Sequence, residues 1–468
     1  MGTCSTKNHS DLPKVSVKIP IKEPFNNYYT AIDKFYKRSD AMTIFKAIEK
    51  ISKVLVVVKQ IRKVIDSSSI QYEIEMLQKL DYPHIVRLYD YFQSQNHYFI
   101  IYQISRSDKL LEHFKGEKEK LAMSEYQQAF KQALRTLAYI HSKSIFHGKL
   151  DASNTFFGID GFLATGFEYA EDLNLLGKKK GGLIKYQSAL SIGFQAPEVI
   201  KGRFGCPSDV WSLGVLFYSA VAGEMPFKGS SIEETKQMIN DNSMDSIILK
   251  KRGFDDNMVD LLDKMLTKNY KERVTAEQLL KHPFFEPEKT NPIDIINVYQ
   301  DCKIFGKKNK LSQKFMYNIA DFLMTWKDRS VVRESFQKFD LNNDGVISLE
   351  EFTQAIHHAG LSFKESEAKR LFQQIDYDGN GTIEYTEFLA VFAKVRRDEF
   401  MNTLKGLFLE MDKNEDEKIS LTEFIEFLGQ QPEFENEIEA FKALAKNNHT
   451  ISYSEFCDLI NKRLEIDS

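Results

Sequence analysis

The sequence predicts a protein of several domains, in which an α+β domain is followed by an all-α module. Its 468 residues divide into two to four domains at about 150 residues each. Residues 331–468 carry 15 Lys or Arg and 28 Asp or Glu, a net charge of −13, whereas the residues before them carry +9. Acidic loops also repeat in this C-terminal third. We therefore place a domain boundary near residue 330.

Composition excludes several classes of protein. The chain is 42% hydrophobic and 28% charged, with only 11 Pro and 23 Gly, which is typical of a globular protein rather than a disordered or collagenous one. The uncharged stretch 210–223 is 14 residues long, short of the roughly 20 that a membrane span needs. The four cysteines show no disulfide or metal spacing, so we expect a cytoplasmic protein. The basic surplus lacks interleaved aromatic residues, and we expect no nucleic-acid partner.

Three loops of the C-terminal third begin at Asp340, Asp376 and Asp412, with 36 residues between successive starts. Each places oxygen side chains at loop positions 1, 3, 5, 9 and 12, the spacing of an EF-hand. Ca²⁺ takes six to eight oxygen ligands, and the final Glu supplies two. With the backbone carbonyl of the seventh residue included, the expected calcium ligands are Asp340, Asn342, Asp344, Val346, Ser348 and Glu351, then Asp376, Asp378, Asn380, Thr382, Glu384 and Glu387, then Asp412, Asn414, Asp416, Lys418, Ser420 and Glu423.

The third loop departs from the pattern at one position. Gly345 and Gly381 stand where the first two loops need a turn with φ > 0, but the third has Glu417 there. A residue other than glycine in that conformation costs about 1–2 kcal/mol, so we expect weaker binding. A fourth unit lacks carboxylates at the ligand positions, and we expect it to pair with the third loop, Ile451 against Ile419, without binding calcium. Residues 331–468 are thus predicted to hold four EF-hand units.

A different series of motifs occurs in residues 25–285, and their order is informative. The series is Val54–Lys59, Tyr72–Leu77 with Glu73, Asp81–Leu88, Ile145–Asp151 with Asn154, Ala196–Glu198, Ser208–Gly214, and Arg273 before His282–Phe285. It resembles a protein kinase domain. Followed by EF-hand units, the chain is similar to a calcium-dependent protein kinase of the plant and protist type. The resemblance implies a two-lobed α+β protein-kinase-like fold joined to an all-α EF-hand module.

The resemblance also implies roles for the residues that match. Lys59 and Glu73 match the pair that orients nucleotide phosphates, and Asn154 matches a metal ligand. The pair admits two interpretations, residual ATP binding or an ion pair that holds the small lobe without nucleotide. Glu198 and Arg273 match a buried ion pair of the large lobe, and Asp209 matches the residue that braces the catalytic loop.

The departures concern the catalytic positions. The family's catalytic Asp is replaced by Lys149, a cation that accepts no proton. Several alignments of the metal-binding motif are open, with Gly166-Phe167-Glu168 preferred, and none puts Asp at the metal position. No glycine occurs between Tyr29 and Lys59, where the family has its phosphate-covering loop. Together these losses are expected to abolish phosphoryl transfer, unless Asp151 acts as a displaced base. Whether the family's cofactors ATP and Mg²⁺ still bind stays open.

The ends and connections carry further expectations. Residues 1–24 form a polar tail in which Gly2 fits the myristoylation pattern and Cys4 stands as a palmitoylation partner, so we expect attachment to a membrane. Residues 286–330 form a junction with a basic run and an amphipathic stretch, Phe315–Trp326. This stretch is expected either to be captured by the calcium-loaded EF-hands or simply to pack on the first of them.

The combined prediction is a calcium-sensing regulatory protein. Calcium would change the surface that an inactive kinase domain presents to a protein partner, whose identity the sequence does not give. Two alternatives stay open. One is an active Ser/Thr kinase with atypical catalytic residues, and the other is a structural scaffold that binds calcium without switching.

Overall fold

The fold was obtained as a computed structural model, and it divides into two compact units, made mainly of residues 57–288 and 289–468. The structure describes residues 19–21, 25–39, 41–50, 54–64, 67–104, 107–115, 122–158, 161–173, 189–285, 292–308, 313, 316–317, 326–392, 404–405, 407–409, 411–414, 416–428, 435–445 and 450–464. Gly2 and Cys4 lie outside these residues, so their acylation stays a prediction. Among the described helices, none is both long and apolar enough to cross a bilayer.

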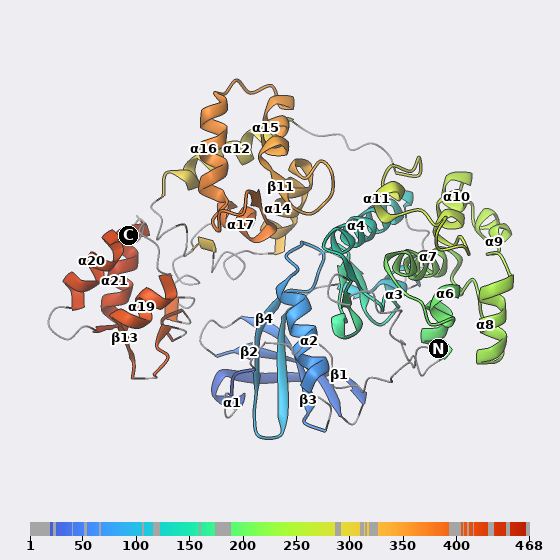
Figure 1. The fold of residues 1–468 in the computed structure, drawn as a ribbon, viewed down its shortest axis with the longest axis horizontal. Helices are drawn as coiled ribbons and strands as arrows, with labels where there is room; N and C mark the ends of the chain where they lie inside the picture. The colour runs from blue at the N-terminus through green and yellow to red at the C-terminus, as the bar shows by residue number, and fades with distance from the viewer. Residues whose placement is uncertain are drawn as a thin grey trace, which may run out of the picture. The chain divides into compact units, whose positions relative to one another are not determined.

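The N-terminal part is a five-stranded sheet with one long helix. Its strands lie in the order β1-β2-β3-β5-β4, and helix α2 packs on β4 (Figure 1). Strand β3 contains three consecutive valines, whose branched side chains suit a buried strand. The elements are α1 (Phe25–Tyr28), β1 (Tyr29–Ser39), β2 (Met42–Glu49), β3 (Leu55–Arg62), α2 (Ser67–Gln78), β4 (Leu88–Gln93) and β5 (His97–Gln103).

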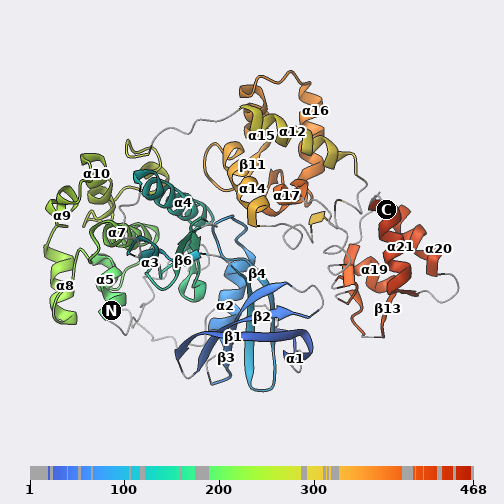
Figure 2. The ribbon, with the colours of Figure 1, turned by 180° about the vertical axis from the view of Figure 1, so that it is seen from behind.

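The part that follows is mainly helical, as Figure 2 shows from behind. Its core surrounds α7, a helix that begins with Pro207 in its first turn and ends at Gly223 with φ 73°, and that buries Trp211 completely. The elements are β6 (Ser107–Lys109), α3 (Leu110–Lys115), α4 (Met123–Ser142), β7 (Ile145–Phe146), β8 (Thr155–Gly158), β9 (Leu163–Ala164), η1 (Phe167–Tyr169), β10 (Glu171–Asp172), α5 (Ala189–Phe194), α6 (Pro197–Ile200), α7 (Cys206–Ala222), α8 (Ile232–Asp241), α9 (Ser246–Lys251), α10 (Asp256–Met265) and α11 (Ala276–Leu279).

The second unit holds two helical lobes, each with a short two-stranded sheet. The predicted pairing of Ile419 with Ile451 is confirmed, and Ile347 faces Ile383 in the same way in the first lobe. The first lobe comprises α14 (Trp326–Phe339), β11 (Ile347–Ser348), α15 (Leu349–His358), α16 (Glu365–Ile375), β12 (Thr382–Ile383) and α17 (Tyr385–Phe392). The second comprises β13 (Lys418–Ser420), α19 (Leu421–Leu428), α20 (Glu435–Ala445), β14 (Thr450–Ser452) and α21 (Tyr453–Leu464). The fold class predicted from the sequence is therefore confirmed.

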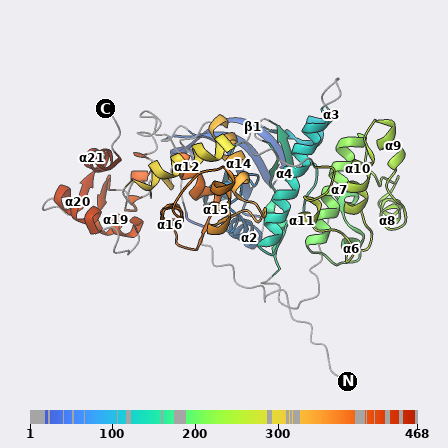
Figure 3. The ribbon, with the colours of Figure 1, turned by 90° about the horizontal axis from the view of Figure 1, so that it is seen from above.

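Helix α12 (Pro292–Gly306) packs on all four helices of the first lobe (Figure 3). One face of α12 is buried, at Ile295, Val298, Tyr299, Cys302 and Phe305. At its edge the Lys303 ammonium lies 3.0 Å from the Glu367 carboxylate. Phe315–Trp326, the stretch that the sequence predicts to be captured by the EF-hands or to pack on the first of them, comes later in the chain. Most of that stretch lies outside the described residues, and Trp326 begins α14, the first helix of the first lobe.

Candidate functional site

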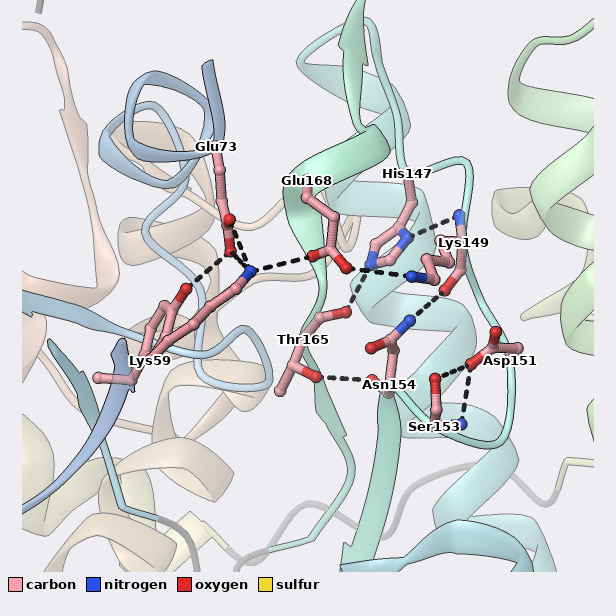
Figure 4. A network of polar contacts seen from close by, with 10 residues as sticks. Lys59, Glu73, His147, Lys149, Asp151, Ser153, Asn154, Thr165 and Glu168 are labelled. Carbon is pink, nitrogen blue, oxygen red and sulfur yellow. Dashed lines mark hydrogen bonds and ion pairs between the residues drawn. The ribbon is translucent and has the colours of Figure 1, made fainter. Parts of the chain in front are cut away.

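The kinase-like part brings together side chains from β3, α2, the loop after β7, and η1 (Figure 4). Lys59 on β3 donates to both carboxylate oxygens of Glu73 on α2, at 3.0 and 2.8 Å. The Tyr102 hydroxyl donates to the same carboxylate at 2.7 Å. Lys59 is 4% exposed and Glu73 is 2% exposed. The pair expected from the resemblance therefore forms, while its role toward nucleotide stays a prediction.

The loop after β7 is held by a side chain of α7. Asp209 accepts hydrogen bonds from the backbone N–H groups of His147 and Gly148, at 2.9 and 3.0 Å. His147 is fully buried, and burial lowers its pKa, so its ring is neutral. The N–H of Lys149 donates to Nδ1 of this ring, which leaves the proton on Nε2, 3.1 Å from the Thr165 carbonyl. The loop is thus rigidly braced, as the match of Asp209 implied.

The residues at the metal position are Gly166, Phe167 and Glu168. The Phe167 ring is buried against the His147 ring, with centroids 4.5 Å apart. Gly166 has φ 82°, and a Cβ built on it would lie 2.5 Å from Cγ and Oδ1 of Asn154. An aspartate at residue 166 therefore has no room unless Asn154 moves. Residue 166 therefore supplies no ligand for the Mg²⁺ that the resemblance implies.

Lys149 stands at the catalytic-base position and is engaged by neighbouring groups. Its ammonium donates to Glu168 at 3.1 Å and lies 4.5 Å from the centroid of the Tyr169 ring. Its backbone carbonyl accepts from the Asn154 amide at 3.2 Å. The other oxygen of Glu168 lies 3.5 Å from the Lys59 ammonium. The Lys149 ammonium is consequently fixed between a carboxylate and an aromatic ring.

Asp151, the candidate displaced base, faces the following turn. One oxygen of its carboxylate accepts from the backbone N–H of Ser153 at 2.8 Å and from the Ser153 hydroxyl at 2.6 Å (Figure 4). This is a local turn-forming interaction. Asp151 therefore stabilises the turn at Ser153.

The large lobe contains the second ion pair that the resemblance implied. Arg273 donates to both carboxylate oxygens of Glu198, at 2.6 and 3.0 Å, and both side chains are buried. This two-pronged geometry suits a guanidinium group and joins α6 to the segment before α11.

The first two EF-hand loops have closely similar hydrogen-bond patterns. The first-position aspartates, Asp340 and Asp376, accept from the glycine N–H at position six, at 3.1 and 3.0 Å. The final glutamates, Glu351 and Glu387, accept from the ninth-position N–H, both at 2.9 Å. The carboxylates at positions 1, 3 and 12 of the second loop converge within 4.8 Å of one another. These oxygen atoms fit a Ca²⁺ ion.

Burial affects the protonation of the second loop. It raises the pKa of Glu387 to about 8 and raises the pKa of Asp376. A bound cation favours the charged carboxylates, so calcium binding here releases protons.

The third loop adopts the same geometry in spite of its missing glycine. Glu417 has φ 63°, and its N–H donates to Asp412 at 2.8 Å, as the glycines do in the other loops. Glu423 accepts from Ser420 N–H at 2.8 Å. In the fourth unit, two of the residues at ligand positions, Lys446 and Asn448, lie outside the described residues.

Two features of the structure were not expected from the sequence. One is the pairing of Glu168 with both Lys149 and Lys59, for which the acidic residue after Gly-Phe was the only signal. The other is the packing of α12, whose apolar residues at 295, 298, 299, 302 and 305 follow a helical period and were a usable signal.

Comparison with known proteins agrees with this geometry. A model of the protein kinase domain matches residues 40–285, and a model of the EF-hand domain pair matches residues 329–393. Calcium-dependent protein kinase 6 of Plasmodium berghei (strain Anka) is 30% identical over 318 residues, which are 67% of this chain and 21% of that protein. Calcium-dependent protein kinase 5 of Plasmodium falciparum (isolate 3D7) is 27% identical over 341 residues, 70% of this chain and 56% of that protein. Calcium-dependent protein kinase 7 of Arabidopsis thaliana is 27% identical over 335 residues, which are 67% of this chain and 58% of that protein. The chain thus spans about a fifth of the first relative and somewhat over half of the other two.

Proposed function

The chain belongs to the protein kinase family, and from the EF-hand pair that follows its kinase domain we propose that it is a calcium sensor whose kinase domain no longer transfers phosphate. In this proposal calcium changes the surface that the kinase domain and junction present to a protein partner. The observation that carries it is the packing of the Asn154 side chain against Gly166, in the space that a metal-binding aspartate needs.

The charge at the base position supports the same proposal. A general base contributes about 10²–10⁴ to the rate of a reaction. Lys149 is paired with Glu168 and stacked on Tyr169, and a charged ammonium accepts no proton from a substrate hydroxyl. Asp151, the remaining candidate, is occupied by Ser153.

The calcium part of the proposal rests on the EF-hand loops and on α12. EF-hands indicate calcium binding, and the first two loops have oxygen side chains at the ligand positions; in the second loop the carboxylates of positions 1, 3 and 12 lie within 4.8 Å of one another. Helix α12 buries its apolar face on the helices that connect these loops. Calcium opens the helix pairs of sensor EF-hands, so it is expected to alter the surface on which α12 packs.

One observation favours the alternative of an active kinase with atypical residues. The Glu168 carboxylate lies 3.5 Å from Lys59, close enough to the site to suggest a displaced metal ligand. The two functions are separated by a phosphorylation assay on the intact protein with Ca²⁺ and either Mg²⁺ or Mn²⁺.

We expect no transfer to peptide substrates or to the protein itself. Lys59→Met serves as the matched control, because it removes the lysine on which the family's nucleotide binding depends. One result would overturn the proposal in favour of the active kinase. It is calcium-stimulated phosphate transfer that is abolished by Lys59→Met and also by either Asp151→Ala or Glu168→Gln.

A further inference from the structure

Four charged side chains form a continuous series in the site where the family holds nucleotide and metal. Glu73 pairs with Lys59 at 2.8 Å, Lys59 lies 3.5 Å from Glu168, and Glu168 pairs with Lys149 at 3.1 Å. The side chains are 3%, 5%, 16% and 16% exposed in that order. Two carboxylates balance two ammonium groups, so the four side chains together carry no net charge.

The four side chains come from segments that are far apart in the sequence. Lys59 lies on β3 and Glu73 on α2, whereas Lys149 lies in the catalytic loop and Glu168 on η1. Figure 4 shows Glu168 between the two lysines, with one oxygen directed toward each. Glu168 is therefore the side chain that links the small-lobe pair to the catalytic loop.

A second set of contacts joins α2 to the segment after η1. The Lys79 ammonium lies 3.0 Å from the Asp172 carboxylate, and the Tyr72 hydroxyl accepts from the Asp172 N–H at 3.0 Å. Helix α2 also packs directly on η1. Helix α2 is thus attached to the large lobe at two points, one of them through Glu168.

We propose that Glu168 replaces the nucleotide–metal complex as the group that joins the two lobes, and that by occupying Lys59 it keeps the site closed to phosphate. The inference rests on the proposed function, since it states what holds the site of a kinase domain that no longer binds ATP and Mg²⁺. Glu168 is a positioning residue, and it acts through Lys59 and Lys149.

The first test measures thermal unfolding of the full-length protein. Glu168→Gln removes one charge from the buried series and leaves Lys149 without its carboxylate, and breaking a buried pair in this way is strongly destabilising. We expect the midpoint of the kinase-domain transition to fall by at least about 4 °C. The control is Glu75→Gln on α2, which removes the more exposed partner of Lys79 and is expected to change the midpoint by less than about 1 °C.

A double-mutant cycle tests the pairing itself. Lys149→Met keeps an apolar stem of similar length and removes the ammonium. If Glu168 acts through Lys149, the midpoint of the double variant Lys149→Met/Glu168→Gln falls clearly less than the sum of the falls in the two single variants. Additive losses, or an unchanged midpoint in Glu168→Gln, would contradict the proposal.

The second test has a readout that a merely structural glutamate would not affect. We expect ATP at about 1 mM, with Mg²⁺ or with EDTA, to leave the midpoint of the parent protein unchanged. In Glu168→Gly, Lys59 keeps its pairing with Glu73 but loses the Glu168 carboxylate, and ATP in EDTA is expected to raise the midpoint by about 3 °C. The rise should be lost in Lys59→Met/Glu168→Gly, because the lysine is then the phosphate-binding group.

The outcomes separate the two proposals. If the parent binds ATP with Mg²⁺ and Glu168→Gln abolishes this binding, Glu168 is a metal ligand and the inference is wrong. If the parent transfers phosphate, the proposed function fails. If there is neither binding nor transfer but Glu168→Gly gains no ATP response, the inference alone fails.

Discussion

The side chain of Asn154 occupies the space next to Gly166 that any larger residue would need. A Cβ at Gly166 would lie 2.5 Å from Oδ1 of Asn154 and 2.8 Å from Nδ2. Asn154 is itself held by the carbonyl of Lys149, at 3.2 Å, and so it is not free to turn away at no cost. Asn154 therefore links the metal-binding position, Gly166, to the base position, Lys149.

Gly166→Ala should destabilise the kinase domain more than a glycine replacement that meets no neighbour. Its matched control is Gly202→Ala, which has nearly the same φ, 78° against 82°, but nothing within 4 Å of the added Cβ. Backbone strain should lower the free energy of unfolding of both variants by about 1–2 kcal/mol. In Gly166→Ala the free energy of unfolding should fall further, because Asn154 must shift. Denaturant unfolding in a Trp326→Phe background, where Trp211 in α7 is the remaining tryptophan, measures both. Equal losses would mean that Asn154 yields without cost.

The intact protein should bind two to three Ca²⁺ ions in the range of about 10⁻⁷–10⁻⁵ M. Glu351→Gln and Glu387→Gln each remove the ligand that supplies two oxygens, so each should remove one site in calorimetry. Glu350→Gln is the control, because this exposed neighbour of Glu351 contacts Gln354 instead of the loop. Unchanged stoichiometry in the two ligand variants would refute the assignment.

Glu417→Gly should tighten the third calcium site. The left-handed conformation of Glu417, φ 63°, costs about 1–2 kcal/mol, which corresponds to about a 5-fold to 30-fold gain in affinity when glycine removes it. Asn343→Gly in the first loop is the comparison, because Asn343 has φ 60° but asparagine tolerates this region. Calorimetry that finds the same gain for both variants, or none for Glu417→Gly, would contradict this account.

Lys268 should make the stability of the large lobe depend on pH. Burial lowers the pKa of Lys268 to about 8, and its ammonium lies over the rings of Trp211 and Phe227. In the unfolded chain a lysine titrates near about 10.4. Between these two values the unfolded state binds more protons, so the free energy of unfolding should rise with pH in this window.

The test compares Lys268→Met with the parent protein across that window. The rise that Lys268 contributes should be absent from Lys268→Met and still present in Lys271→Met, which removes an exposed lysine of the same segment. The difference between parent and Lys268→Met should therefore change from pH 8 to pH 10.4 and be constant below pH 8. A constant difference throughout would show that Lys268 does not titrate there.

Calcium should change the reactivity of Cys302 on α12. This thiol is completely buried, and burial raises its pKa, so it reacts slowly while α12 stays packed. Opened EF-hands offer a larger apolar surface to α12, so alkylation followed by mass spectrometry should be slower with calcium than without. Cys206 in α7 is the internal control, and Phe305→Ala should accelerate labelling by loosening the packed face. Equal rates with and without calcium would favour the scaffold that binds without switching.

Much of the candidate site was predictable because its information is local. The calcium ligands occur within twelve-residue loops, and the turn that needs φ > 0 is visible as a glycine in the first two of them. The pairing of Ile419 with Ile451 was predicted from their corresponding places in the repeated units. The order of the kinase motifs predicted the two-lobed fold. The expectation for Phe315–Trp326 stays a prediction, because most of that stretch lies outside the described residues. Helix α12 was not predicted, because several stretches between residues 286 and 330 have helical periodicity and sequence alone does not choose between them.

By itself the sequence determined which chemical groups are present: the calcium ligands of three loops, a lysine where the family has a base, and no aspartate at the metal position. Only the tertiary structure decided what those groups do to one another. Glu168 meets Lys59 and Lys149, and Asn154 fills the space beside Gly166, because β3, α2, the catalytic loop and η1 pack together. Loop motifs are encoded by neighbours along the chain, whereas buried ion pairs depend on the distances between segments that only packing brings within reach of a side chain.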